Sequence, residues 1–348
     1  MVFNLSFDPL LLTYDTSYEN SLDFSPAFQE FARDLASRLV KTYEIRGKHV
    51  IEIGCGNGDF LKMLCQTGDN QGFGLDPSYD GASMAQAGDQ VTFVRDLYSE
   101  AYIDRPADLI CCRHVLEHLP NPRELLVSLR RMLSNRLSTV VYFEVPNAES
   151  VLGGATMWDV NYPHCLYFSR PALARLFREA GFLVVRLEPC FGHQFLYAEA
   201  RPGETAAHHD QDAAAIKRVV ALASRFDQQF KATVSYWSAL IRGAIRARRR
   251  VALWGSGAKG TMFLNLVPAG AKIDVVVDLN PRKQGMYVPG TGQQVVCPEQ
   301  LREFRPDLIL ISNPLYESEI REMVRKLGLV AELVPILSVK PSPPARVA

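Results

Sequence analysis

The chain has 348 residues, of which 38 are basic and 38 acidic, so its formal net charge is zero. This length is sufficient for two domains, each with its own core, and the balanced charge gives no indication of nucleic acid or membrane partners. With no apolar run of roughly 20 residues, no signal-peptide pattern and no C-x-x-C pair among seven cysteines, we expect a cytoplasmic protein with reduced thiols.

The N-terminal residues 1–46 carry several aromatic and acidic side chains, Tyr14 and Tyr18 among them. A helical pattern follows in this segment, with Phe28, Phe31, Leu35 and Leu39 on one face. We expect residues 1–46 to form a helical cap over a binding site, with Tyr14 and Tyr18 contacting the substrate.

The most informative stretch lies at residues 50–58, where an apolar strand is followed by Gly54, Gly56 and Gly58 at alternate positions. Glycine has no Cβ, so this turn can adopt unusual dihedral angles and approach a ligand closely. The strand also contains Glu52, a carboxylate in an otherwise apolar run that requires a partner. The spacing is G-x-G-x-G, which differs from the G-x-G-x-x-G of dinucleotide sites.

Three further segments follow the glycine turn at spacings typical of a nucleoside site: Asp76-Pro77 about 20 residues on, Asp96-Leu97, and Cys112-Arg113-His114. Together with the turn, they resemble class I S-adenosyl-L-methionine (SAM) methyltransferases over about 90 residues. The resemblance implies that SAM is bound and S-adenosyl-L-homocysteine (SAH) released. It places Glu52, the glycine turn, Asp76 with Pro77, Asp96, Leu97 and Arg113 around the cofactor, with Asp76 on the ribose and Asp96-Leu97 on adenine.

The segment His114-Val115-Leu116-Glu117-His118 matches H-x-x-E-H, a zinc-peptidase pattern. It directly follows a predicted strand, and Pro120 and Pro122 end it before a helix could continue. In class I methyltransferases a similar stretch lines the cofactor pocket. We therefore expect no metal.

A loop at residues 161–169 is rich in His, Tyr and Cys and precedes a helix for which Ser169 is a good N-cap. The loop contains His164, and an ordinary histidine titrates near neutrality, which suits a general base that accepts a proton during methyl transfer. The alternative is a histidine that only hydrogen-bonds the loop backbone.

Strands and helices alternate over residues 47–202, as a mostly parallel sheet requires, with the last strand expected at 191–200. A polar break follows, and residues 203–250 form a predicted helical connector. The alternation then restarts over residues 251–340. The sequence thus predicts an α/β protein with a Rossmann-like SAM methyltransferase domain and a second, C-terminal Rossmann-like α/β domain that binds the substrate.

The second domain begins with Gly255-Ser256-Gly257-Ala258-Lys259-Gly260, which fits G-x-G-x-x-G and is followed by Asp278 at the distance of a ribose-binding acid. Alone, this motif indicates NAD. Two observations weaken that interpretation, because Lys259 brings a cation into the phosphate turn and methyl transfer needs no hydride carrier. A diphosphate belonging to the substrate would fit the turn equally well.

The SAM domain, the His164-x-x-Tyr167-Phe168-Ser169 loop, the 255–260 turn and the segment 276–291 together resemble the sugar C-methyltransferases over roughly residues 14–335. That family methylates nucleotide-linked 4-keto-deoxysugars at a carbon next to the ketone. The resemblance implies that His164 is the general base, that the resulting enolate attacks the sulfonium methyl group, and that Tyr162 and Tyr167 assist. We expect the substrate between the domains, contacted also by Asn147, His193, Gly255, Lys259 and Asn313.

The chain departs from that family in three places. The paired cysteines of its N-terminal zinc module are missing, since the first cysteine is Cys55. The loop sequence Tyr-His-Glu-His becomes Asn161-Tyr162-Pro163-His164, in which Tyr162 can supply a phenol from a neighbouring position but Pro163 cannot replace a carboxylate. Phe191-Gly192-His193-Gln194 replaces a glycine-rich turn and adds a second histidine.

The predicted function is SAM-dependent C-methylation of a small, nucleotide-linked ketosugar, with no nucleic-acid or membrane partner. An O- or N-methyltransferase acting on another small molecule is the first alternative. An NAD-dependent oxidoreductase that uses the second domain is the rival class, and a catalytically silent binding protein ranks last. The sequence leaves the acceptor, the methylated atom and the oligomeric state open.

Overall fold

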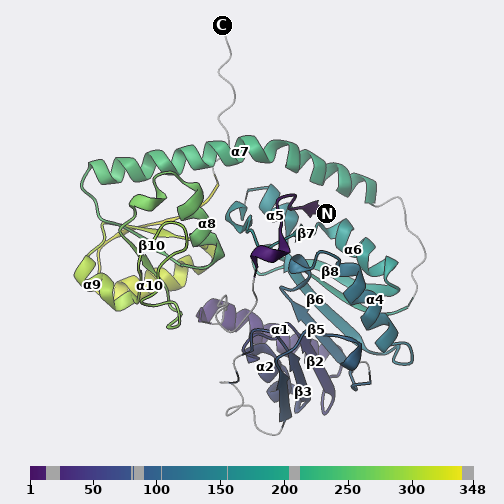
Figure 1. Cartoon of the computed structure of the whole chain (residues 1–348). Helices are drawn as coiled ribbons and strands as arrows, with labels where there is room; N and C mark the ends of the chain where they lie inside the picture. The colour runs from purple at the N-terminus through teal and green to yellow at the C-terminus, as the bar shows by residue number, and fades with distance from the viewer. Residues whose placement is uncertain are drawn as a thin grey trace. The chain divides into compact units, whose positions relative to one another are not determined.

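The computed structural model describes residues 1–12, 24–79, 81, 90–102, 104–154, 156–203 and 212–338. These residues group into two compact units, and Figure 1 labels the larger helices and several of the strands. The first unit comprises Met1–Asp23, Phe28–Ala148 and Tyr162–Arg218, and the second comprises Phe24–Ala27, Glu149–Asn161 and Val219–Ala348. Residues 149–161, which the sequence pattern places in the SAM-binding domain, belong to the second unit.

The first unit is built on a seven-stranded sheet of order β4-β3-β2-β5-β6-β9-β8. Its strands are β2 (His49–Ile53), β3 (Gln71–Leu75), β4 (Val91–Val94), β5 (Leu109–Arg113), β6 (Val140–Pro146), β8 (Phe182–Cys190) and β9 (Phe195–Pro202). Neighbouring strands are parallel except for β9, which is antiparallel to both β6 and β8. The strand order reverses at β2 and β5, and ligands of open α/β sheets bind at the carboxyl ends of strands at such a point.

Helices and short turns connect these strands. They are η1 (Pro9–Leu11), α1 (Pro26–Thr42), α2 (Asp59–Gly68), η3 (Glu100–Tyr102), η4 (Leu116–His118), α4 (Pro122–Met132), α5 (Ala148–Leu152) and α6 (Arg170–Glu179). The first two residues of α1 and all of α5 after Ala148 belong to the second unit. A separate two-stranded ladder pairs β1 (Val2–Phe3) with β7 (Leu166–Tyr167) in antiparallel fashion. Helix α1 buries Phe28, Leu35 and Leu39, as its sequence pattern predicts.

The sheet of the first unit is covered on both faces, because alternate residues of its strands enter two different apolar clusters. Ile51 and Ile110 belong to one cluster, while Val50 and Leu109 belong to the other. Burial on both faces explains why these strands are almost continuously apolar in sequence. The last strand begins at Phe195 instead of residue 191, because Phe191, Gly192 and His193 have positive φ angles and form a turn.

The second unit contains a five-stranded, fully parallel sheet of order β12-β11-β10-β13-β14. Its elements are η5 (Met157–Asp159), α7 (Asp212–Arg246), β10 (Val251–Trp254), α8 (Ala258–Leu266), η6 (Gly270–Lys272), β11 (Val275–Val277), β12 (Val295–Val296), η7 (Pro298–Gln300), α9 (Leu301–Phe304), β13 (Leu308–Ile311), η8 (Pro314–Tyr316), α10 (Glu317–Lys326) and β14 (Glu332–Pro335). Only the part of α7 from Val219 onward belongs to this unit. The two sheets confirm the predicted pair of Rossmann-like α/β domains.

Residues 149–161 join the second unit through buried aromatic contacts. The Trp158 ring lies 5.0 Å from that of Phe263, and its Nε1 donates to the carbonyl oxygen of Ile336 at 3.1 Å. Trp237 of α7 donates in the same way to the carbonyl of Leu337 at 2.9 Å.

Within the described ranges, no helix combines the length and the apolar character that a bilayer crossing demands.

Candidate active site

The glycine turn after β2 requires glycine for two different reasons. Gly54, Gly56 and Gly58 have φ angles of 72°, 51° and 81°, in the region that side chains disfavour. A Cβ on Gly54 would lie 2.2 Å from the Val115 side chain, and one on Gly58 would lie 2.2 Å from the Phe93 ring. At Gly56 a Cβ would meet no atom within 4 Å, so the backbone there borders open space that a ligand could occupy.

Asp76 connects the glycine turn to the end of β3. Its side chain is buried, and Oδ2 accepts from the Gly56 N–H at 2.8 Å. Oδ1 accepts from the Ser78 backbone N–H at 2.8 Å and from the Ser78 hydroxyl at 2.6 Å. A carboxylate has about four acceptor positions, so three protein donors leave capacity for one more. Pro77 lies between Asp76 and Ser78 in the chain.

Asp96 and Leu97 follow β4 and are exposed. Asp96 Oδ1 accepts from the Leu97 N–H at 2.8 Å, and Oδ2 accepts from the Tyr102 hydroxyl at 2.7 Å. Because β4, β3, β2 and β5 are parallel, these residues share one sheet edge with the glycine turn and with Arg113. The structure thus gathers the predicted cofactor residues at the carboxyl edge of the first sheet, with Glu52 buried in β2 beneath them.

Arg113 ends β5 and is buried. Its guanidinium lies 4.3 Å above the centre of the Phe60 ring, and Nη2 donates to Glu144 Oε1 at 3.2 Å. The arginine predicted to face the cofactor is therefore held by a carboxylate of the neighbouring strand β6. This contact was not expected from the sequence.

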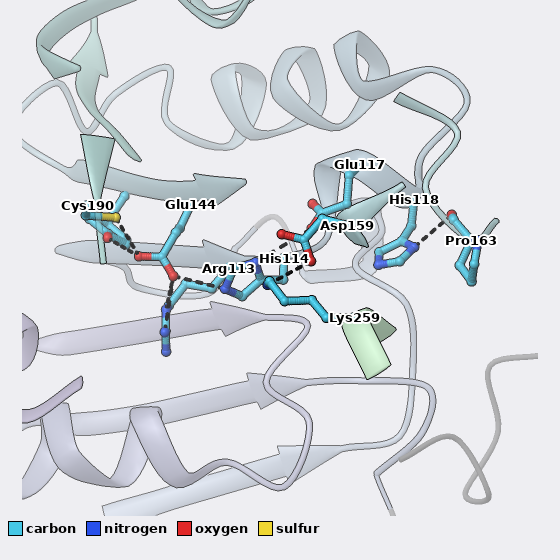
Figure 2. A network of polar contacts seen from close by, with 10 residues as sticks. Arg113, His114, Glu117, His118, Glu144, Asp159, Pro163, Cys190 and Lys259 are labelled. Carbon is cyan, nitrogen blue, oxygen red and sulfur yellow. Dashed lines mark hydrogen bonds and ion pairs between the residues drawn. The ribbon is translucent and has the colours of Figure 1, made fainter. Parts of the chain in front are cut away.

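Glu144 is fully buried at the centre of a polar network (Figure 2). Besides Arg113, its Oε1 lies 3.0 Å from His114 Nε2, while Oε2 accepts from the Tyr142 hydroxyl at 2.8 Å and from Cys190 Sγ at 3.5 Å. Burial opposes the charged form of Glu144, but Arg113 and His114 outweigh it and lower the pKa of this carboxyl to about 2.

His114 extends the network from Glu144 to Glu117. Its Nδ1 lies 3.7 Å from Glu117 Oε1, and its backbone has a φ of 57°, which turns the chain sharply after β5. Burial favours the neutral imidazole, but the two carboxylates outweigh it and raise the pKa of His114 to about 9. Near neutral pH the charges therefore alternate along Arg113, Glu144, His114 and Glu117, as low-dielectric surroundings require.

This network predicts a pH-dependent stability. The pKa of His114 rises from 6.5 to about 9 on folding, so its contribution is complete below pH 6.5 and is lost as the pH rises through 9. The pKa of Glu144 falls from 4.5 to about 2, so its contribution is complete above pH 4.5 and is lost as the pH falls through 2. We expect the urea midpoint of unfolding to decrease as the pH rises from 6.5 to 9. This decrease should be smaller in His114→Asn, which lacks the titrating imidazole. The control variant His49→Asn removes an exposed histidine and should show the same decrease as the wild type.

His164 is buried in the loop before β7, and this loop is bonded to η4. The Cys165 N–H donates to the Glu117 carbonyl at 2.9 Å, and His118 Nδ1 donates to the Pro163 carbonyl at 3.0 Å. One donor atom each from Glu117, His118 and His164 lies within 4.8 Å of the others, a grouping that could accept a metal ion. Glu117, however, already has a cationic neighbour in His114.

The two tyrosines of this loop have different surroundings. The Tyr162 hydroxyl accepts from the Asp8 N–H at 3.1 Å and donates to the Ser6 carbonyl at 3.2 Å, so it fastens the N-terminal segment. Tyr167 is buried in β7, and its ring centre lies 5.6 Å from that of His164. Of the two, Tyr167 is the phenol beside the predicted base.

Asn147 and His193 are the predicted substrate residues of the first unit. Asn147 is buried, and its Nδ2 donates to the His193 carbonyl at 3.0 Å, so the two residues lie together. The His193 side chain is exposed on the turn between β8 and β9, where its φ is 64°. Tyr14 and Tyr18 lie outside the described residues.

Gly255 and Asn313 follow β10 and β13, the neighbouring strands at which the order of the second sheet reverses. A Cβ on Gly255 would lie 2.1 Å from Ser312 Oγ, and its φ is 104°, so only glycine fits. Asn313 is buried and its Oδ1 accepts from the Leu315 N–H at 3.2 Å, as a helix cap. The structure thus brings these two predicted substrate residues to one sheet edge.

The remaining residues of the second glycine turn are also engaged. Asp278 Oδ2 accepts from the Ser256 N–H at 2.8 Å, which repeats in the second unit the bond between Asp76 and Gly56. Lys259 lies 2.7 Å from Asp159 Oδ1, and Figure 2 includes this ion pair. The cation predicted to face a phosphate therefore has an acidic neighbour in its own unit.

Three functional candidates were missed in the sequence: Glu144, His114 and Glu117. Glu144 interrupts the apolar strand at 140–146, the same signal that drew attention to Glu52. His114 and Glu117 are interpreted in the sequence as a zinc motif or as part of a stretch that lines the cofactor pocket, although their spacing equally permits an ion pair. A single acidic residue in a buried strand, such as Glu144, is a signal in the sequence that a basic partner must lie nearby.

Comparison with known proteins supports the two-domain organisation. Residues 27–187 match a family described as a methyltransferase domain, and residues 199–329 match one described as a C-methyltransferase C-terminal domain. The ubiquinone biosynthesis O-methyltransferase of Glaesserella parasuis serovar 5 is 27% identical over 122 residues, which are 32% of this chain and 51% of that protein. Its counterpart in Klebsiella pneumoniae strain 342 is 28% identical over 94 residues, 25% and 38% of the two chains. The chain spans about half the length, or less, of these curated relatives.

Solved structures show weaker likenesses. An O-methyltransferase family protein from Burkholderia thailandensis superposes with a TM-score of 0.42 at 17% identity, covering 51% of this chain and 57% of that one. A magnesium protoporphyrin IX methyltransferase from Synechocystis, solved with SAH, gives 0.39 at 19% identity, covering 51% and 84%. The family matches thus place a methyltransferase domain at residues 27–187 and a C-methyltransferase C-terminal domain at residues 199–329, in agreement with the two sheets of the fold.

Proposed function

We propose that the protein methylates a carbon next to the ketone of a small, nucleotide-linked ketosugar, with SAM as the methyl donor and His164 as the general base. The observation that carries this proposal is the match of residues 199–329 to the C-methyltransferase C-terminal domain. A second domain of this kind is unnecessary for methyl transfer itself, so we assign it to the substrate.

For the cofactor, we assign the nucleoside part to the carboxyl edge of the first sheet. The open space beside Gly56 and the remaining acceptor capacity of Asp76 fit a ribose, and Asp96 with Leu97 is the candidate adenine contact. Glu52 and Arg113 complete the proposed lining. When bound, SAM supplies an electrophilic methyl group that needs no further activation.

The chemical work left to the chain is proton removal and alignment. His164 is buried in a loop fastened to η4, so its imidazole is held without a large entropic cost when the substrate binds. It takes the proton from the carbon next to the ketone, and the electron pair of that C–H bond moves into the enolate. A positioned base contributes about 10²–10⁴-fold, and alignment of the reacting atoms roughly 7–11 kcal/mol.

O-methylation of another small molecule is the second candidate. The curated relatives are ubiquinone biosynthesis O-methyltransferases, although they align with only about a third of this chain or less. In such a reaction His164 would take a hydroxyl proton instead of a carbon-bound one, with the same loop geometry.

The two candidates are separated by incubation with methyl-labelled SAM and a panel of nucleotide ketosugars and phenols, followed by mass and NMR analysis. We expect a labelled C-methyl group in a ketosugar product, and deuterium exchange at the same carbon in D₂O without SAM. An O-methyl product, or the absence of carbon exchange in every ketosugar tested, would contradict C-methylation.

A further inference from the structure

The loop before β7 has no carboxylate next to the proposed base, since Pro163 precedes His164. A carboxylate reaches the base from another element, because Glu117 of η4 offers an oxygen within 4.8 Å of a His164 ring nitrogen. We propose that Glu117 is the positioning residue of His164, which orients the imidazole and stabilises the imidazolium formed when it takes the proton. The inference rests on the proposed function of His164.

The position of Glu117 relative to His164 is fixed because the residues on both sides of His164 are hydrogen-bonded to η4. The backbone N–H and Sγ of Cys165 both contact the Glu117 carbonyl, at 2.9 and 3.3 Å. A carbonyl can only accept, so His118 Nδ1 must carry the proton it shares with Pro163 at 3.0 Å. The residues immediately before and after His164 are thus tied to η4, and the base cannot move away from the carboxylate independently.

The charge pattern gives Glu117 its effect. Glu117 is 1% exposed, so its interaction with a neighbouring charge is weakly screened. Arg113, Glu144, His114 and Glu117 alternate in charge, and an imidazolium at His164 continues this alternation by one step. The network therefore favours the protonated base, which is the state that proton abstraction creates.

The other titratable groups beside Glu117 or His164 do not replace Glu117. They are His114, His118, Cys112, Cys165 and Tyr167. Burial raises the pKa of both thiols, so neither carries a negative charge near neutrality. Among the described residues next to His164, Glu117 is thus the anion, with Glu144 one step farther along the network.

The test compares Glu117→Gln, which keeps the shape and removes the charge, with Glu117→Asp, which keeps the charge. The exposed Glu124→Gln on α4 is the matched control. The titration of His164 is followed by NMR through its ring proton, assigned by its loss in His164→Asn. An opposite charge at this range shifts a pKa by about one unit or more, so we expect the His164 midpoint to fall by about one pH unit in Glu117→Gln.

The same variants are then assayed for carbon deuterium exchange against pH. Because a less basic His164 is deprotonated at lower pH, the rising limb of the profile should move to lower pH and the plateau rate should fall, with little change in SAM affinity. Glu117→Asp should restore part of the shift of the rising limb and part of the plateau rate, and Glu124→Gln should match the wild type in both measurements. An unchanged His164 midpoint in folded Glu117→Gln would overturn the inference, whereas absence of exchange in the wild type would overturn the proposed function instead.

Discussion

Replacing His164 with alanine is expected to lower the rate of carbon deuterium exchange, and of methyl transfer, by about 10²–10⁴-fold, the contribution of a positioned base. The loss should appear in kcat, because the glycine turn and Asp76 that we assign to SAM are formed by other elements. The measurement combines NMR of exchange in D₂O with calorimetric titration of SAM.

A matched histidine variant separates base chemistry from general damage. His49 is exposed at the amino end of β2, the opposite end of the sheet strand from the glycine turn, so His49→Ala should retain wild-type exchange. Exchange at the wild-type rate in His164→Ala would exclude this residue as the base and would make His193 the next candidate.

Replacing Glu144 with glutamine should lower the free energy of unfolding by about 3–5 kcal/mol, the usual effect of removing one partner from a buried ion pair. Glutamine has nearly the same shape, so packing within β6 is preserved. The loss has an electrostatic origin: the buried Arg113 and the partly buried His114 would keep positive charges with no opposite charge between them.

Urea denaturation at pH 7 measures this effect, and Glu179→Gln provides the comparison. Glu179 pairs with Arg175 on the exposed side of α6 at 2.7 Å, and exposed pairs contribute about 0–1 kcal/mol. A loss below about 1 kcal/mol in Glu144→Gln, with an unchanged dependence on urea concentration, would mean that the network is not a stabilising element.

The sequence predicted the two Rossmann-like domains because the signals that define them are local. Alternating apolar strands and helices indicate parallel sheets, and the glycines at 54–58 and 255–260 mark the turns after their first strands. The same local signals fixed the apolar faces of α1 and α2, whose Phe28, Leu35, Phe60 and Leu64 are buried.

These local signals do not determine which segments distant in the chain pack together. The segment 149–161 was assigned to the first domain by continuity, yet Trp158 belongs to the core of the second unit because its indole packs on Phe263. The last strand was placed four residues early, since a turn of positive φ angles at 191–193 has no apolar pattern of its own.

By itself, the sequence determined the fold class and the positions of the two glycine turns, because each depends on residue types at fixed spacings along the chain. Only the tertiary structure revealed that Arg113 and His114 share the buried Glu144, and that Glu117 lies beside His164, although 47 positions separate the two in the chain. The physical reason is that charge pairing depends on distance through space, and parallel strands bring together at one sheet edge side chains that are remote in sequence.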